Sequence, residues 1–420
     1  MRVLLLSTTT GYQLRSFAAA AERLGLDLLL ATDRCHQLED PWRDGAVPVR
    51  FYDDDASLSA IEAAARERPI DGVIAVGDRP TPLAARAAEA LGLRGNPVAA
   101  AEIARSKRAM RRAFTSARLE MPWFIDLPAT ADSRVIGAAI PYPCVVKPLG
   151  LSGSRGVIRA DSSEQLVSAV KRIRGLLARP ELRAERTGWL DELIVEGYLE
   201  GPEYAVEGVL TGGQLRVLAI FDKPDPLIGP FFEETIYVTP PAIPPALARA
   251  IGDEVRRATT AIGLVHGPVH AECRVGPAGV VMLEVAARPI GGICSRVLRF
   301  EGGEGELASL EEVLLRHACG QDVSRYVREA SAAGVMMIPI PKRGIYKGVA
   351  GATAASAVDH VEAVEITAKP GQLLEPLPEG DSYLGFLFAR AAEPGTVVAA
   401  LRSAHQELEF EILPEIPVIR

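Results

Sequence analysis

The chain has 420 residues, a formal net charge of −8 and 48% apolar residues, enough for a large buried core in roughly two to four domains. This acidic balance lacks the basic footprint that binding to a phosphate backbone requires, so no nucleic-acid partner is expected. The apolar run after Met1 turns polar at Ser7, too soon for a membrane span, and predicts a first core strand. Five cysteines without a CxxC pair indicate reduced, mostly buried thiols in a cytoplasmic protein.

The N-terminal part alternates short apolar segments with alanine-rich helical patterns. Residues 3–6, 27–31 and 72–76 are strand-like, while residues 12–24 and 82–91 have helical periodicity and each end at a glycine. This order predicts a small parallel α/β unit. The loop after the first strand has one glycine, fewer than a dinucleotide fingerprint needs, which argues against an NAD site there.

Beyond Asn96 the residue composition and the pattern of predicted elements change. A helix rich in Arg and Lys is predicted over 99–114, and β-like segments separated by glycine loops follow up to Gly320. A third region of short strands begins near Met336 and ends with a helix and a last strand. No repeat of roughly 20 to 50 residues is present, which excludes solenoid folds.

The first group of candidate residues surrounds Lys147. A strand carrying this lysine leads into a loop and returns as a second strand, so backbone N–H groups and hydroxyls could surround anionic oxygens. We call residues 150–156 the glycine loop; its candidate phosphate contacts are Gly150, Ser152, Gly153, Ser154 and Gly156. The spacing is not that of a P-loop, and a flexible hairpin turn beside a surface lysine is the alternative.

The second group follows an apolar strand that ends at Glu196. A glycine-containing hinge with Leu199 comes next, and Glu203 stands seven residues after Glu196. Such a hinge could offer backbone groups to a base edge, and Glu203 could accept two ribose hydroxyls. A solvated acidic connection between two strands is the alternative.

The third group is a predicted hairpin, with strand-like runs on both sides of Gly-Pro-Ala-Gly at 276–279. A turn centred at Pro277 and Ala278 would place Glu272 and Glu284 almost opposite each other, on one face with His270, Met282 and Arg288. Two facing carboxylates repel unless a cation lies between them, and oxygen ligands favour Mg²⁺ together with substrate phosphates. The alternative is a surface hairpin with solvated charges, against which its apolar neighbours argue.

Taken in this order, the three groups resemble the ATP-grasp superfamily of carboxylate-amine ligases, and the resemblance covers nearly the whole chain. It implies a multidomain α/β and α+β protein with an ATP-grasp fold. We expect a parallel α/β pre-ATP-grasp domain at 1–96, the ATP-grasp domain at 97–320 with its lid at about 120–198, and a C-terminal α+β domain at 321–420.

The resemblance also implies ATP as the nucleotide, with the glycine loop as a mobile cover over the triphosphate. The contacts it implies are Glu196 and Leu199 at adenine, Glu203 at the ribose, and Lys107 and Lys147 at the α and β phosphates.

By the same resemblance, Glu272 and Glu284 would hold Mg²⁺, for which Mn²⁺ could substitute, and Arg288 would stabilise the transferred phosphoryl group. The usual metal strand of the superfamily reads Glu-x-Asn-x-Arg, but Ala286 stands at the asparagine position and removes one expected ligand. A shortened metal set of this kind is associated with the L-amino acid ligase branch, which forms dipeptides. Residues 334–390 resemble the C-terminal domain of that branch.

Candidate substrate residues come from a segment that resembles Glu-x-x-His-x-x-Pro of that branch. Glu234 keeps the carboxylate, which could pair with a substrate ammonium, and Tyr237 replaces the histidine. Gly291 and Gly292 follow Arg288 and predict a roomy acid pocket, although they could simply form the turn that leaves the strand.

The expected activity is ATP-dependent formation of an amide bond through an acyl phosphate, with release of ADP and phosphate. The partners would be ATP, a small carboxylic acid and an amine, with an amino acid as at least one of them; no membrane is expected, and a homodimer is compatible with the sequence. One alternative is an ATP-grasp ligase with a nucleotide-pathway or carboxyphosphate-type substrate. Another is a non-catalytic nucleotide-binding partner or sensor.

Overall fold

A four-stranded parallel sheet forms the N-terminal part of the fold, in the order β3-β2-β1-β4. The computed structural model describes residues 1–8, 13–33, 46–128, 130–186, 188–302, 305 and 307–415, so residues 9–11 of the loop predicted over 7–11 and Cys35 lie outside the described residues. The elements of this part are β1 (Arg2–Ser7), α1 (Leu14–Arg23), β2 (Asp27–Thr32), β3 (Val47–Pro48), α2 (Asp54–Glu67), β4 (Gly72–Val76) and α3 (Thr81–Ala90).

Both faces of this sheet are covered, which explains the continuous apolar sequence of β1. Val3 and Leu5 pack against Phe17 of α1 on one face, whereas Leu4 and Leu6 pack on the other face with residues of α2 and α3. The predicted parallel α/β unit is confirmed.

The basic helix predicted over 99–114 is two helices, α4 (Val98–Arg105) and α5 (Lys107–Ser116). Ser106 separates them, because its backbone is extended and its Oγ accepts a hydrogen bond from the Ala109 N–H at 3.3 Å. The break makes Lys107 the first residue of a new helix. The expectation of one continuous helix was therefore wrong.

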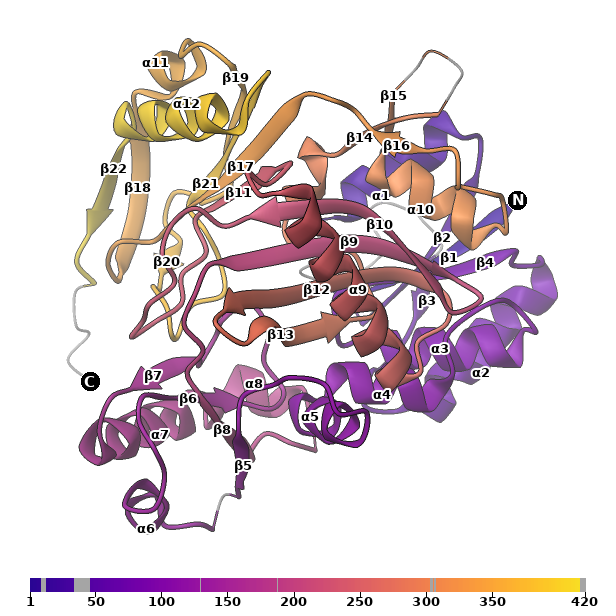
Figure 1. The fold of residues 1–420 in the computed structure, drawn as a ribbon. Helices are drawn as coiled ribbons and strands as arrows, with labels where there is room; N and C mark the ends of the chain where they lie inside the picture. Colours follow the sequence, from indigo (N-terminus) through magenta and orange to yellow (C-terminus); the bar gives the residue numbers. More distant parts are fainter. Residues whose placement is uncertain are drawn as a thin grey trace.

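The segment predicted to be the lid forms a four-stranded antiparallel sheet in the order β5-β8-β6-β7, at the lower left of Figure 1. Its elements are β5 (Phe124–Leu127), α6 (Ser133–Gly137), β6 (Cys144–Pro148), β7 (Ile158–Ala160), α7 (Ser163–Leu177), α8 (Pro180–Ala184) and β8 (Leu193–Gly197). It has a core of its own beneath α7. β6 carries Lys147 and returns as β7, as predicted, with the glycine loop between them.

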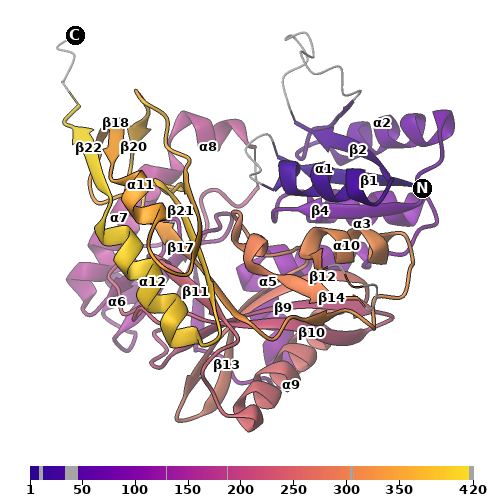
Figure 2. The same cartoon turned by 90° about the horizontal axis from the view of Figure 1, so that it is seen from above.

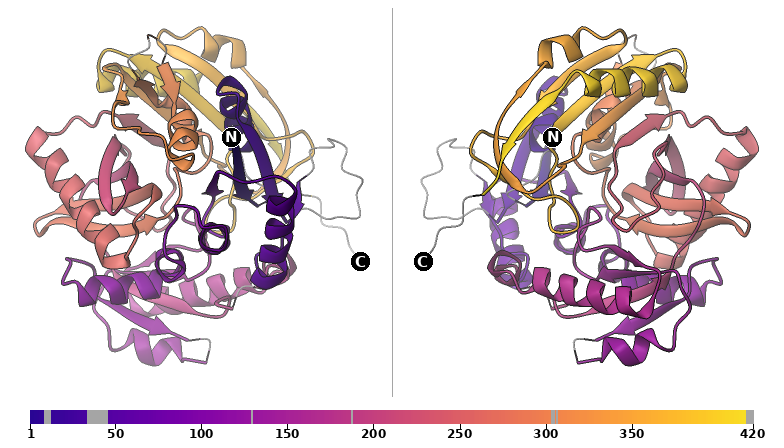
Figure 3. Two further views of the ribbon diagram at one scale, coloured as in Figure 1. Left: turned by 90° about the vertical axis from the view of Figure 1, so that its right-hand side faces the viewer. Right: turned by 90° about the vertical axis from the view of Figure 1, so that its left-hand side faces the viewer.

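An eight-stranded antiparallel sheet forms the centre of the molecule, in the order β13-β12-β9-β10-β11-β17-β21-β19. Its strands are β9 (Glu203–Thr211), β10 (Gln214–Asp222), β11 (Ile236–Thr239), β12 (Gly267–Gly276), β13 (Gly279–Ala286), β17 (Ala332–Ile338), β19 (Val361–Ile366) and β21 (Gly385–Ala391). The sheet continues from the middle part of the chain into the C-terminal part. Helices α9 (Pro245–Ile262) and α12 (Pro394–Gln406) pack against it, and Figure 3 shows α12 in yellow along the C-terminal strands.

Two small sheets complete the described fold. The first has the order β15-β14-β16 and the second β20-β18-β22. The remaining elements are η1 (Cys294–Val297), β14 (Arg299–Glu301), β15 (Leu307–Ser309), α10 (Leu310–Ala318), β16 (Val327–Arg328), β18 (Gly344–Ala350), α11 (Ala352–Ser356), β20 (Leu373–Leu374) and β22 (Glu409–Leu413).

The four cysteines within the described residues, Cys144, Cys273, Cys294 and Cys319, carry free thiols, and the first three are buried. None of the helices described is long and apolar enough to cross a membrane.

Candidate active site

A cavity of about 700 Å³ lies where the N-terminal part, the lid, the central sheet and the C-terminal part meet. Of the predicted site residues, Gly156 is outside the lining. Those that line the cavity are Lys107, Lys147, Gly150, Ser152, Gly153, Ser154, Glu196, Leu199, Glu203, Glu234, Tyr237, Glu272, Glu284, Arg288, Gly291 and Gly292. The fold thus brings residues from the three sequence groups to one place.

The hairpin of β12 and β13 has its two-residue turn at Pro277 and Ala278, and its register places Glu272 directly opposite Glu284. A bulge next to this pair leaves Leu283 without a partner residue, so Cys273 faces Met282. Met282 is consequently buried in the core beneath α9, and its predicted position on the carboxylate face was wrong. The facing pair itself is confirmed.

Lys223 lies at the centre of a carboxylate cluster. Its Nζ is 2.7 Å from Glu203 Oε1, 2.6 Å from Glu234 Oε1 and 2.7 Å from Glu272 Oε1. Burial opposes its charge, but the three carboxylates together raise the pKa of Lys223 well above its usual value. The sequence patterns did not single out this lysine, although it stands at a strand end before a proline, as Lys147 does.

Two further side chains fix Glu272. The hydroxyl of Tyr237 donates a hydrogen bond to Glu272 Oε1 at 3.3 Å, and burial raises the pKa of Tyr237 well above its usual value, so the hydroxyl keeps its proton. His270 lies between Glu207 and Glu272, with Nε2 3.7 Å from Glu272 Oε1. Despite burial, Glu207 raises the pKa of His270 to about 9. His270 pairs with Ala286 in the register, so the imidazole lies opposite the position at which the resemblance leads one to expect an asparagine ligand.

At the end of the cavity where phosphate is expected, Lys147 is held by a buried carboxylate. Glu196 accepts a 2.7 Å contact from Lys147 Nζ and a two-pronged contact from Arg111, at 2.7 and 3.2 Å. Although burial opposes ionisation, Arg111 and Lys147 lower the pKa of Glu196 to about 2. The carboxylate predicted to meet adenine is therefore engaged in an ion-pair cluster, because Arg111 reaches it from one helical turn beyond Lys107.

Lys107 connects the glycine loop to the hairpin. Its Nζ donates a hydrogen bond to Leu151 O at 2.8 Å and lies 4.0 Å from Glu284 Oε2. The ammonium is thus next to both the loop expected to cover phosphates and one of the expected metal ligands.

The rings of Tyr198 and Phe232, stacked with centroids 6.3 Å apart, form the apolar end of the cavity. Arg274 lies beside them, and its Nε is 2.9 Å from Glu203 Oε2. Lys223 and Arg274 therefore occupy both oxygens of Glu203, which was predicted to bind the ribose. Arg274 was missed, although it shares the face of Glu272 at a spacing of two residues along β12.

Arg288 is paired with the N-terminal part. Its Nε and NH2 lie 2.9 and 3.2 Å from the two carboxylate oxygens of Asp78, a bidentate contact. Asp78 follows β4 at the carboxyl edge of the parallel sheet, where ligand-binding residues commonly lie, and this position is the signal that could have identified it. The arginine predicted at the transferred phosphoryl group thus also joins two domains.

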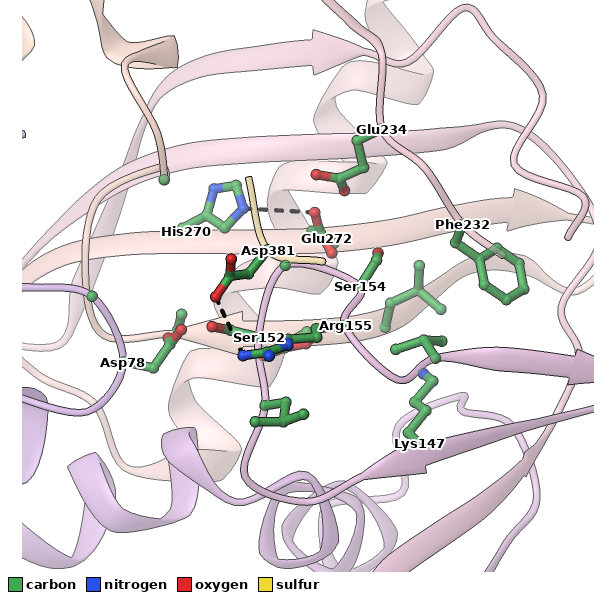
Figure 4. A pocket seen from close by; sticks show the side chains of 18 of the residues that line it. Asp78, Lys147, Ser152, Ser154, Arg155, Phe232, Glu234, His270, Glu272 and Asp381 are labelled. Carbon is green, nitrogen blue, oxygen red and sulfur yellow. Dashed lines mark hydrogen bonds and ion pairs between the residues drawn. The ribbon is translucent and has the colours of Figure 1, made fainter. Parts of the chain in front are cut away.

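The C-terminal part reaches the glycine loop. The Gly156 N–H donates a hydrogen bond to Pro378 O at 2.9 Å, and Arg155 donates to Glu379 O at 2.9 Å and contacts Asp381 at 3.2 Å. Figure 4 shows the Arg155–Asp381 pair beside Ser152 and Ser154. The loop is therefore fastened from outside the lid, which no pattern in the sequence indicated.

The two glycines after Arg288 have different surroundings. A side chain at Gly291 would meet open space, whereas Gly292 has φ +61° and its Cβ would lie 3.4 Å from the Phe386 ring. Open space of the kind predicted for an acid pocket is therefore present at Gly291 and not at Gly292.

Families of known domains match three stretches of the chain: an ATP-grasp domain at residues 140–297, an ATP-grasp N-terminal domain at 18–95 and an L-amino acid ligase C-terminal domain at 336–412. The crystal structure of an L-amino acid ligase from Bacillus licheniformis is similar over 98% of both chains, with 27% identity and a TM-score of 0.82. The chain belongs to the ATP-grasp superfamily. Within it, the chain belongs with the proteins that carry the L-amino acid ligase C-terminal domain.

Two further relatives are longer than this chain. The ATP-grasp enzyme fsqD of Aspergillus fumigatus is 27% identical over 279 residues, which cover 62% of this chain and 46% of the relative. The alanine–anticapsin ligase of Bacillus subtilis is 30% identical over 207 residues, which cover 46% of this chain and 42% of the relative. The matches thus span less than half of each relative's length.

Proposed function

We propose that this protein is an ATP-dependent carboxylate-amine ligase that forms an amide bond, with an amino acid as at least one substrate, and releases ADP and phosphate. The observation that carries the proposal is the facing pair Glu272 and Glu284, in one cavity with Lys107 and Lys147. Acidic ligands for a cation next to basic ligands for phosphate suit a metal-bound triphosphate.

The donor set fits a hard divalent cation. Glu272 and Glu284 offer carboxylate oxygens from facing positions, whereas the nearby cluster of Glu203, Glu234 and Glu272 oxygens is already occupied by the Lys223 ammonium. Oxygen donors of this kind favour Mg²⁺, with Mn²⁺ as a substitute, and Ala286 contributes no ligand. When bound by Glu272 and Glu284, the ion would supply charge neutralisation at the phosphates.

The proposed reaction has two steps. A carboxylate oxygen of the acid attacks the γ-phosphorus of ATP, the bond to the β–γ bridging oxygen breaks, and ADP leaves. The amine nitrogen then attacks the acyl carbon, phosphate leaves with the bonding electron pair, and the amine proton passes to solvent. The protein's own contribution is to position the reactants and offset charge, for which we assign Lys107, Lys147 and Arg288.

Glu234 is the proposed partner of the α-ammonium of the acid substrate. Lys223 contacts one of its oxygens at 2.6 Å, and 17% of its side chain remains exposed. Burial, reinforced by Glu272, raises the pKa of Glu234, so an additional cation at this carboxylate would be stabilising.

The test is phosphate release by the purified chain with MgATP and pairs of the twenty L-amino acids, with products identified by mass spectrometry. We expect ADP, phosphate and a dipeptide for a subset of pairs. AMP and pyrophosphate as products, or ATP cleavage that no amino acid stimulates, would contradict the proposal.

A further inference from the structure

We propose that Arg79 and Arg105 form a subsite for the carboxylate of the amine substrate. This inference rests on the proposed ligase function and deepens it, because it makes the amine an amino acid or another amino carboxylate. A simple amine or ammonia would leave the two arginines without their ligand.

Arg79 is fixed at the cavity wall beside the site already described. It directly follows Asp78, which holds Arg288, and only 18% of its side chain is exposed. Its NH1 is 3.5 Å from Asp33 Oδ2, and its NH2 donates to Glu185 O at 2.9 Å. These contacts come from the N-terminal part and from the end of α8, so they hold the guanidinium where the two meet. Figure 2 shows α8 on the side of the lid that faces the N-terminal sheet.

Arg105 lines the same cavity from the last position of α4, two residues before Lys107. Its guanidinium lies 5.3 Å from the centre of the Trp189 ring. Within the described part of the chain, it forms no ion pair with a carboxylate. Burial and the neighbouring charge of Arg79 lower its pKa. A half-buried cation without a paired anion raises the free energy of the folded protein, and an anion that binds next to it would offset this penalty.

The position of this pair favours a carboxylate over the triphosphate of ATP. A planar guanidinium matches the oxygens of a carboxylate and those of a phosphate alike, so the position of the pair in the cavity decides between the two. In Figure 4, Asp78 lies on the opposite side of the cavity from Phe232 and Lys147, which mark the nucleotide side in our assignment. Arg79 follows Asp78 in the chain, and Asp78 holds Arg288, so Arg79 belongs to the part of the cavity wall that carries Arg288.

The two substrates differ in what their carboxylates do. The carboxylate of the acid is the reacting group, and we assign it to Arg288. A second carboxylate in the cavity must therefore come from the amine substrate, and Arg79 and Arg105 remain to bind it.

The first test needs no turnover, because Trp189 lies against Arg105 and can report binding. The chain has three tryptophans, and a variant with Trp42 and Trp123 replaced by Phe leaves Trp189 as the fluorophore. This variant is titrated with each L-amino acid and its α-amide, with Mg²⁺ and a non-hydrolysable ATP analogue present. We expect a saturable change with at least one amino acid, and roughly 10- to 100-fold weaker binding of its amide. Calorimetry on the unmodified chain repeats the comparison.

Arg105→Gln should abolish the discrimination between amino acid and amide. Three results would overturn the inference: no amino acid changes the signal, the amide binds as well as the acid, or Arg105→Gln removes a response to the ATP analogue or inorganic phosphate. Because this binding test needs no turnover, it shows whether the two arginines bind a carboxylate even if the chain proves not to be a ligase.

The second test is kinetic. Arg105→Gln and Arg79→Gln should each raise the KM for the amine substrate roughly 10- to 100-fold and leave the KM for ATP unchanged. Arg66→Gln is the matched control, since Arg66 lies on α2 with 72% of its side chain exposed and should change neither constant. Equal increases in both KM values would assign the arginines to the nucleotide and contradict the inference.

Discussion

Replacing Glu196 by glutamine tests the buried ion-pair cluster most sharply. Glu196 is 1% exposed and is the shared anion of Arg111 and Lys147. The pKa of this carboxyl falls from its usual 4.5 to about 2, a change that corresponds to roughly 3 kcal/mol of stability at neutral pH. Breaking a buried pair from one side costs roughly the same, 3 to 5 kcal/mol.

Two measurements follow from that magnitude. Urea unfolding at pH 7 should show Glu196→Gln to be less stable by about 3 kcal/mol, and calorimetry should show weaker ATP binding, because Lys147 loses the carboxylate that orients it. The folded-state pKa is lowered, so the stabilisation is present above pH 4.5 and is lost as the pH falls through about 2. The variant, which has no titrating group here, should lack that loss.

Glu192→Gln is the matched control from the same segment. Glu192 pairs with Arg108, but 32% of its side chain is exposed, so its loss should cost at most about 1 kcal/mol. Adding Arg111→Met to Glu196→Gln should recover part of the stability, because it removes a buried cation without a partner. A Glu196→Gln variant as stable as Glu192→Gln, with unchanged ATP affinity, would refute the reasoning.

Further predictions concern the metal, the substrates and pH. Glu284→Ala should abolish turnover. Its melting temperature should stay within a few degrees of that of the unmodified chain, because the carboxylate is 32% exposed and its ion-pair contact with Lys107 is long, at 4.0 Å. Full activity in this variant would exclude Glu284 from the metal site. Glu234→Gln should raise the KM for the acid far more than the KM for ATP, and equal changes would contradict its role as the ammonium partner. Gly291→Trp should raise the KM for bulky acids and leave the KM for small acids unchanged. Gly292 is unsuitable for this test, because its φ of +61° strains any side chain. An equal rise in KM for all acids would contradict the predicted pocket. Burial, with the neighbouring His266, lowers the pKa of His317 to about 4. The free energy of unfolding should therefore fall as the pH drops below 6.5, by about 2 kcal/mol at pH 5. An identical pH dependence in His317→Gln would exclude this histidine as the cause.

The parts of the site that could be predicted are those encoded by local spacing. A Gly-Pro-Ala-Gly turn with strand-like flanks placed Glu272 opposite Glu284, and a strand that runs into glycines and serines marked the glycine loop. Both patterns lie within about 20 residues of sequence, where period and turn chemistry determine the geometry.

The partners of these residues could not be predicted in the same way. Asp78 lies 210 residues before Arg288, and Arg111 lies 85 residues before Glu196. Which cation meets which carboxylate depends on how the domains pack, and spacing along the chain carries no such information. The bulge in β13 could not be predicted from the sequence either, because no glycine or proline stands at that position. It places Met282 in the core instead of on the face of the carboxylates.

The acyl-phosphate step is the central claim, and an isotope experiment tests it most directly. The acid substrate is labelled with ¹⁸O in its carboxylate, and the chain is incubated with MgATP and the amine. One carboxylate oxygen becomes the bridge to the transferred phosphorus and leaves with it, so the released phosphate should carry one ¹⁸O and the nucleotide product should be unlabelled ADP. Label in AMP, or unlabelled phosphate accompanied by amide formation, would contradict the account.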